Sequence, residues 1–127
     1  MEVQNEKAKF KEKFRQRVYK FALDIIKFVE EIPKEQTSRI IIISGQLLRS
    51  ATSIGANVVE VQGASSRKDY TNFFTYALKS ANETKFWLGL LRDSGKAERE
   101  ATDKLLKETT EIANILAASI LTLKGKR

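Results

Sequence analysis

Residues 38–62, SRIIIISGQLLRSATSIGANVVEVQ, decide between a helical and a strand-containing fold. The run from Ile40 to Ile43 on its own also fits a buried strand. Apolar residues then continue at steps of three and four, at Leu47, Leu48, Ala51, Ile54, Val58 and Val61. A strand of this length would be unusual, so the spacing predicts one helix over about residues 37–62. Gly45 and Gly55 lie inside it, and we expect a neighbouring helix to approach closely there.

Three more helices are predicted around this segment. Residues 5–32 carry an apolar stripe that ends at Pro33, the single proline of the chain. Residues 67–93 follow an N-cap at Ser66, paired with Asp69, and end before Gly95 as C-cap; residues 97–123 form the last helix. Short connections make consecutive long helices antiparallel neighbours. The sequence therefore predicts one all-α domain over residues 1–127, an antiparallel up-down four-helix bundle.

The composition removes most catalytic chemistry. The chain has no cysteine and no histidine, which excludes disulfides, cysteine-ligated zinc and the Ser-His and Cys-His nucleophile pairs. We therefore expect a protein that is not an enzyme, with no catalytic residue, no cofactor and no metal site.

The sequence also lacks membrane and secretion signals. The longest unbroken apolar run, Ile40 to Ile43, is far shorter than a membrane span, and residues 1–14 are charged without the apolar core of a signal peptide. We expect a cytoplasmic protein with no membrane partner.

The charge balance favours an anionic partner. Lys and Arg number 23 against 16 Asp and Glu, a net charge of +7, and nucleic acid is the usual partner of such a protein. A solvated, lysine-rich surface is the alternative explanation.

The basic residues concentrate where the two ends of the chain meet. In an antiparallel bundle the start of the first helix and the end of the fourth lie at the same end, which should be the most positive part. No base-reading motif accompanies this charge, so binding would act through phosphates. The candidate nucleic-acid contacts are Lys7, Lys9, Lys11, Lys13, Arg15, Arg17, Arg67, Lys68, Lys124, Lys126 and Arg127.

A polar stripe follows one face of the second predicted helix. Its residues are Arg49, Ser53, Asn57 and Glu60, and Ser80 and Glu83 form a similar step on the third helix. One interpretation is a pair of facing carboxylates, Glu60 and Glu83, for acid-base or metal chemistry. A Glu-x-x-His motif, typical of di-metal bundles, is missing. We therefore favour a buried hydrogen-bonded network in which Arg49 neutralises a glutamate, Asn57 and Ser53 satisfy the rest, and helix register is fixed.

Aromatic residues cover more than one face of the third predicted helix, at Tyr70, Phe73, Phe74 and Tyr76. One face packs into the bundle. The other fits a subunit interface, where aromatic residues are enriched. Stacking on nucleobases is the alternative, although no RNA-binding fold is expected here.

Two segments carry a family resemblance. Residues 49–60, RSATSIGANVVE, resemble the helix-two signature of the 23S rRNA intervening-sequence protein family, often labelled four helix bundle protein and formerly a ribosomal protein. The helix-three signature is matched by Lys68, Asp69, Tyr70, Phe73, Ala77, Ser80, Ala81 and Glu83. The likeness spans about residues 17–121. Gly55 stands where a proline is common, and Val61-Gln62 replaces a common glycine.

The resemblance implies a small bacterial protein whose up-down bundle assembles into a ring, often a homopentamer. Many relatives are encoded within insertions in large-subunit rRNA genes, and a related bundle serves retroelement reverse transcriptases as an RNA- and protein-binding accessory. Together with the charge, this favours a homo-oligomer that binds RNA or a ribonucleoprotein. A protein-interaction scaffold whose basic surface is incidental stays open as the alternative.

Overall fold

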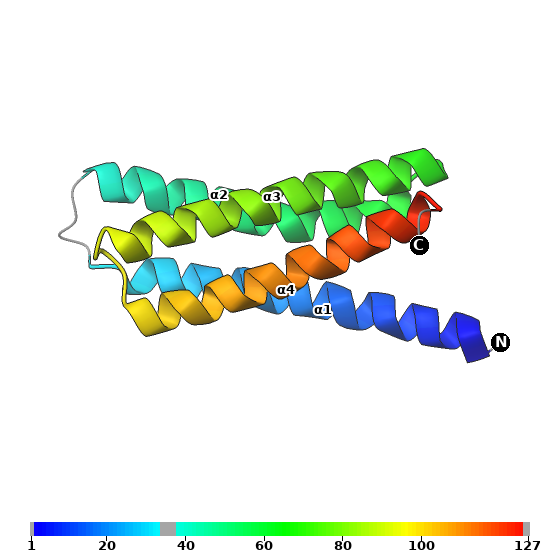
Figure 1. Cartoon of the computed structure of the whole chain (residues 1–127), viewed down its shortest axis with the longest axis horizontal. Coiled ribbons are helices and arrows are strands. Elements are labelled where there is room, and N and C mark those ends of the chain that lie inside the picture. Colours follow the sequence, from blue (N-terminus) through cyan, green and yellow to red (C-terminus); the bar gives the residue numbers. More distant parts are fainter. Residues whose placement is uncertain (1, 34–37, 126–127) are drawn as a thin grey trace.

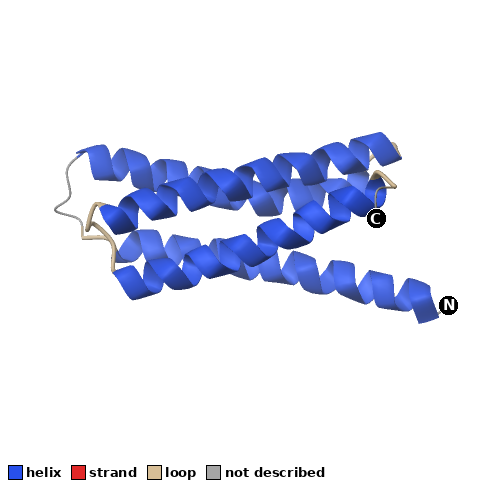
Figure 2. Ribbon diagram, viewed as in Figure 1, coloured by secondary structure: helices blue, strands red, loops and turns tan. Residues whose placement is uncertain are grey.

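Within residues 2–33 and 38–125, the part described by the computed structural model, the chain forms four long helices and no strand. They are α1 (Glu2–Glu31), α2 (Ser38–Glu60), α3 (Arg67–Asp93) and α4 (Arg99–Leu123), and the short 3-10 helix η1 (Val61–Gly63) follows α2. The helices run alternately in opposite directions along one long axis (Figure 1). Figure 2 shows short loops at the described connections. The predicted all-α four-helix bundle is confirmed.

Local hydrogen bonds fix both ends of α3 as the sequence predicts. The Ser66 Oγ accepts a hydrogen bond from the Asp69 amide at 3.0 Å, which caps the N-terminus. Gly95 has a φ of 73°, and the amides of Gly95 and Lys96 donate to carbonyl groups in the last turn of the helix. These two bonds form a Schellman motif that ends the helix.

Other helix ends differ from the prediction by a few residues. α4 begins at Arg99 instead of residue 97 because Glu98 is extended, with a ψ of 128°. Its carboxylate accepts hydrogen bonds from the amides of Glu100 and Ala101 at 3.2 and 2.6 Å, and so caps the helix. α2 ends at Glu60, because η1 takes up the residues predicted to be its last turn. α1 begins at Glu2, three residues before the predicted start.

The core is built from the predicted apolar stripes. Members spaced by three and four residues on each helix are fully buried, among them Phe21, Ile25, Leu47, Ile54, Leu88, Leu91, Ile112 and Leu116. Each such side chain stabilises the fold by about 1.5–3 kcal/mol relative to an exposed position. Phe10 and Phe86 keep the apolar spacing of the segments 5–32 and 67–93 but lie outside the core, since they are 56% and 59% exposed.

The N-terminal half of α1 diverges from the other three helices. Figure 1 shows α1 leaving the bundle toward its N-terminus while its C-terminal part stays alongside α2 and α4. The burial of its stripe changes accordingly, because Val18 and Phe21 are almost fully buried whereas Phe10 is exposed. The bundle is therefore open at the end where the start of α1 and the end of α4 lie.

The two glycines of α2 occupy different surroundings. A Cβ atom at Gly55 would lie 3.9 Å from the carbonyl oxygen of Val18 in α1, an ordinary contact distance. A Cβ atom at Gly45 would meet nothing within 4 Å among the described residues. The predicted close approach of a helix is therefore wrong at Gly45, which is exposed together with Ile41 and Ile42.

Candidate nucleic-acid interface

Three helix ends bring positive charge to the open end of the bundle. The start of α1, the start of α3 and the end of α4 lie there, as the antiparallel arrangement requires (Figure 1). Arg67, the first residue of α3, donates a hydrogen bond from Nε to the carbonyl oxygen of Leu123 at 2.9 Å. A cation at this position also interacts favourably with the negative end of the α4 dipole. Lys124 follows directly and is exposed.

A groove opens between the diverging α1 and the helices opposite. Its volume is about 1110 Å³, and residues from α1, α3, α4 and the end of α2 line it. The floor is apolar and includes Phe14, Phe74, Val58, Ile115 and Leu123. The groove is slightly larger than the roughly 300–1,000 Å³ of typical small-molecule pockets.

Two aromatic pairs form facing parts of this groove. On α1 the rings of Phe10 and Phe14 are stacked, with centroids 6.5 Å apart and 5° between the planes. On α3 the rings of Tyr70 and Phe74 meet edge to face at 5.1 Å. The Lys11 Nζ lies 5.6 Å from the centroid of the Tyr70 ring, which joins the two sides by a cation–π contact.

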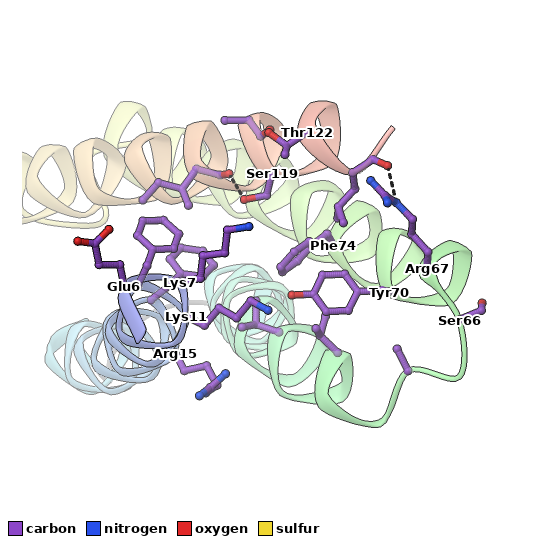
Figure 3. Close-up of a pocket in the computed structure, with 18 of the residues that line it drawn as sticks. Glu6, Lys7, Lys11, Arg15, Ser66, Arg67, Tyr70, Phe74, Ser119 and Thr122 are labelled. Atoms are coloured by element: carbon purple, nitrogen blue, oxygen red, sulfur yellow. Dashed lines mark hydrogen bonds between the residues drawn. The ribbon is translucent and has the colours of Figure 1, made fainter. Parts of the chain in front are cut away.

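The predicted cations of α1 divide into two sets. Lys7 and Lys11 line the groove and reach toward Tyr70 and Phe74 (Figure 3). Lys9 and Lys13 are exposed but do not line it. Lys68 in α3 is likewise exposed outside the groove, and Lys126 and Arg127 lie outside the described residues.

Arg15 also lines the groove, but its guanidinium is engaged elsewhere. Its Nη2 lies 2.7 Å from Oε2 of Glu12, and the side chain points away from Tyr70 (Figure 3). The hydrogen bond from Arg15 lowers the pKa of Glu12 below its ordinary value. Among the described residues that line the groove, Glu6 contributes the one carboxylate.

Arg17 belongs to a different arrangement. Its guanidinium binds Glu108 of α4 through two hydrogen bonds, Nε to Oε2 at 2.7 Å and Nη2 to Oε1 at 2.6 Å, and Nη2 also donates to Glu111 at 2.9 Å. The hydrogen bond with Glu108 is the main reason that the pKa of Arg17 is raised. Two carboxylates thus balance this cation, and it does not line the groove.

Five of the six residues of the predicted polar network form contacts between α2 and α3, in two separate groups, and the group with Arg49 is not buried as predicted, since that side chain is 58% exposed. Arg49 forms an ion pair with Glu83, whose Oε2 also accepts a hydrogen bond from Trp87 Nε1 at 2.9 Å. Ser80 Oγ donates to Ser53 Oγ at 3.1 Å. Within α2, Asn57 Nδ2 donates to both the carbonyl oxygen and the Oγ of Ser53, at 2.9 and 3.2 Å.

Glu60 is not part of this network, which corrects the prediction that Glu60 and Glu83 face each other. Ser53 and Ser80 lie side by side, and α2 and α3 run in opposite directions. Glu60 is seven residues beyond Ser53 and Glu83 three beyond Ser80, so the carboxylates move apart by about 15 Å along the axis. Glu60 is exposed, and no paired-carboxylate site forms between the two.

A buried hydrogen bond completes the contact of α2 with α3. Thr84 Oγ1 lies 2.9 Å from Ser50 Oγ and donates at 2.7 Å to the carbonyl oxygen of Ser80. Ser50 and Thr84 are both 0% exposed. The sequence signal was available, since each occupies an apolar position of its helix, three residues after Leu47 and Ala81 respectively.

The described residues contain no group of three or more acidic side chains that could hold a metal ion. Nor is any helix within residues 2–33 and 38–125 long and apolar enough to cross a membrane.

The comparison with known proteins agrees with this architecture. The model of a family described as 23S rRNA-intervening sequence protein matches residues 11–118. The chain belongs to this family. It is similar to a crystal structure from Bacteroides thetaiotaomicron, described as a protein with unknown function from the S23 ribosomal protein family. The two are 36% identical, with a TM-score of 0.76 over 84% of this chain and 97% of that one. No curated protein matches.

Family membership confirms the resemblance carried by residues 49–60 and by the helix-three signature. In this 23S rRNA intervening-sequence family member, the matched region contains the whole polar network. The groove extends past both ends of that region, because Lys7 and Phe10 precede it and Thr122 and Leu123 follow it. The groove is therefore partly built from residues that the family model does not cover.

Proposed function

We propose that this protein is a non-enzymatic, oligomeric helical bundle that binds RNA or a ribonucleoprotein in the cytoplasm through its basic end. The observation that carries the proposal is the convergence of Lys7 and Lys11 of α1 with Arg67 of α3 around one groove, while exposed Lys124 directly follows the groove residue Leu123 at the end of α4. A net charge of +7 adds long-range attraction for a polyanion.

The family adds a second line of support. Its description refers to 23S rRNA, and the solved relative is assigned to a ribosomal protein family. These descriptions connect the family with ribosomal RNA, and they agree with a phosphate-binding surface on this chain. Such binding depends on salt, because cations released from the RNA drive it.

Assembly into a homo-oligomer, a pentamer by resemblance to the family, is supported by an apolar face on α1. Tyr19, Leu23 and Ile26 are 70%, 43% and 39% exposed and recur at steps of four and three on one side of the helix. A ring would present several basic ends at once and raise RNA affinity by avidity without new contacts.

The proposal is tested by light scattering coupled to size exclusion, with absorbance followed at 260 and 280 nm before and after nuclease treatment. We expect a mass several times that of one chain, with nucleic acid that nuclease removes. Leu23→Lys places a charge on the α1 face and should reduce the mass to that of a monomer. A wild-type monomer would contradict the assembly, and an oligomer unable to bind added RNA would contradict the RNA-binding role.

A protein-interaction scaffold is the second candidate function. Exposed Phe86 and Tyr76 on α3, at 59% and 49%, favour it because they offer apolar area away from the basic end. A partner protein retained after nuclease treatment, and lost on Phe86→Ala, would support this role in place of RNA binding.

A further inference from the structure

The groove has an apolar floor that phosphate binding does not explain. Resting on the proposed function, we infer that the groove receives unpaired nucleobases, so that the protein binds single-stranded RNA in preference to duplex. The bases stack on the exposed aromatic rings while the sugar–phosphate chain follows the cations on the rim. The geometry assigns stacking to the exposed ring of Phe10 in α1, and half-buried Tyr70 of α3 lies across the groove beneath Lys11.

Phe10 is placed to offer a ring face. It is 56% exposed, although the stripe to which it belongs is buried further along α1. Its ring lies nearly parallel to that of Phe14, with the two centroids 6.5 Å apart. The remaining exposure leaves room for a planar partner, and base–aromatic stacking tolerates any base because each has a π face.

The cations have the arrangement that a single strand requires. Lys7 and Lys11 are one turn apart, about 6 Å along the helix axis, and both reach into the groove (Figure 3). Arg67 lies on the opposite side, at the end of α4. A row of cations beside aromatic rings is the common design of sequence-tolerant single-strand binding sites. Glu6 opposes phosphate binding, so Glu6→Gln should tighten it.

A duplex cannot use this floor. In A-form RNA the base faces are stacked on one another and phosphates cover the outside. Phosphates entering a floor made of Phe14, Phe74 and Ile115 would lose hydration without gaining hydrogen bonds. Duplex RNA would therefore touch only the rim cations, whereas an unpaired strand can place bases on the floor as well.

The aromatic content favours a base over an acidic amphipathic helix as the occupant. The chain has seven Phe, three Tyr and one Trp, and four of these rings line this one groove. Val58, Ile115 and Leu123 give the groove aliphatic surface that a helix could also use, so the distinction rests on the aromatic rings and the cation beside them. The ring of Tyr70 lies beneath the ammonium of Lys11, beside both a stacking surface and a phosphate partner.

The test compares an unstructured RNA of about 12 nucleotides with the same strand annealed to its complement, by fluorescence anisotropy on the full-length protein. Phe10→Ala is matched with Phe86→Ala, because the two side chains are similarly exposed at 56% and 59% but only Phe10 lines the groove. Phe10→Ala should weaken single-strand binding roughly 5- to 160-fold, the range for loss of one aromatic–base stack. Duplex binding should not change, and Phe86→Ala should leave both affinities unaltered.

A conservative variant keeps the result interpretable. Phe10→Trp should retain single-strand affinity, and circular dichroism should show that all three variants remain helical. Equal affinities for single strand and duplex, both insensitive to Phe10→Ala, would overturn this inference while leaving the proposed RNA binding intact. Absence of binding to either RNA would overturn the proposed function itself. If an acidic helical peptide displaces the single-strand RNA and Phe10→Ala does not change the RNA affinity, the floor belongs to a protein partner and the inference is overturned.

Discussion

The guanidinium of Arg17 in α1 binds the carboxylate of Glu108 in α4 through two parallel hydrogen bonds, 2.7 and 2.6 Å long. This bidentate pair marks the point where α1 begins to diverge, because the groove is lined by α1 residues up to Arg15 and by α4 residues from Ile115 onward. The pair therefore lies beyond the inner end of the groove and connects α1 with α4, two of the helices that line it.

Removing this pair should weaken the attachment of α1. Arg17→Met should lower the free energy of unfolding by about 1 kcal/mol, the upper end for a pair that is about one-third exposed. This free energy is measured by urea denaturation, with the loss of helix monitored by circular dichroism. Arg15→Met serves as the control, since Arg15 pairs with Glu12 of the same helix. Equal stability of Arg17→Met and wild type would show that the pair does not hold α1.

The buried contact between Thr84 and Ser50 should contribute more to the stability of the fold than the exposed polar contacts between α2 and α3. Thr84→Val keeps the shape but removes a hydroxyl that is 0% exposed and hydrogen-bonded, so we expect a loss of about 1 kcal/mol in stability. The double variant Thr84→Val, Ser50→Ala should lose less than the sum of the two single changes, because either single change already removes the contact between the two hydroxyl groups. Fully additive losses would contradict a direct interaction.

Gly45 tests whether a second chain approaches α2. A Cβ atom there meets nothing within 4 Å among the residues that the structure describes, so Gly45→Ala should stabilise an isolated bundle by about 0.5–1 kcal/mol through helix propensity. Thermal unfolding should therefore give a higher Tm. A lower Tm together with a smaller mass in solution would instead place Gly45 in a contact between copies.

Stability should be nearly independent of pH until the carboxylates titrate. The chain has no histidine, so we expect a constant Tm between about pH 6 and 9.

The hydrogen bond from Arg92 lowers the pKa of Asp93 below its ordinary value of 3.8. Because the folded pKa is the lower one, this pair stabilises above pH 3.8, and its contribution is lost as the pH falls through the folded pKa. Arg92→Met should make the acid decline of Tm less steep; an unchanged decline would contradict this assignment.

Features that depend on one helix could be predicted from the sequence. The N-cap at Ser66 and the ending at Gly95 need only local backbone geometry, and both are confirmed. The apolar stripes identified the core for the same reason. The cap at Glu98 escaped prediction because glutamate is not a usual N-cap residue.

Features that depend on how helices lie against each other could not be predicted in the same way. Periodicity placed Glu60 and Glu83 on suitable faces, but the register of α2 against α3 separates them and pairs Arg49 with Glu83. The exposure of Phe10 follows from the divergence of α1, which no single-helix pattern records. The groove therefore became visible only with the packing of the four helices.

The salt dependence of RNA affinity tests the basic end most directly. A plot of log affinity against log salt concentration should have a steep negative slope for wild type. Each contact with a single-strand phosphate should add about 0.7 to the magnitude of that slope. Lys7→Gln with Lys11→Gln should reduce that slope by about 1.4. Lys9→Gln with Lys13→Gln removes the same charge from the same helix but outside the groove, and should leave the slope nearly unchanged. An affinity that does not fall with salt, or equal effects of the two double variants, would contradict RNA binding at the groove.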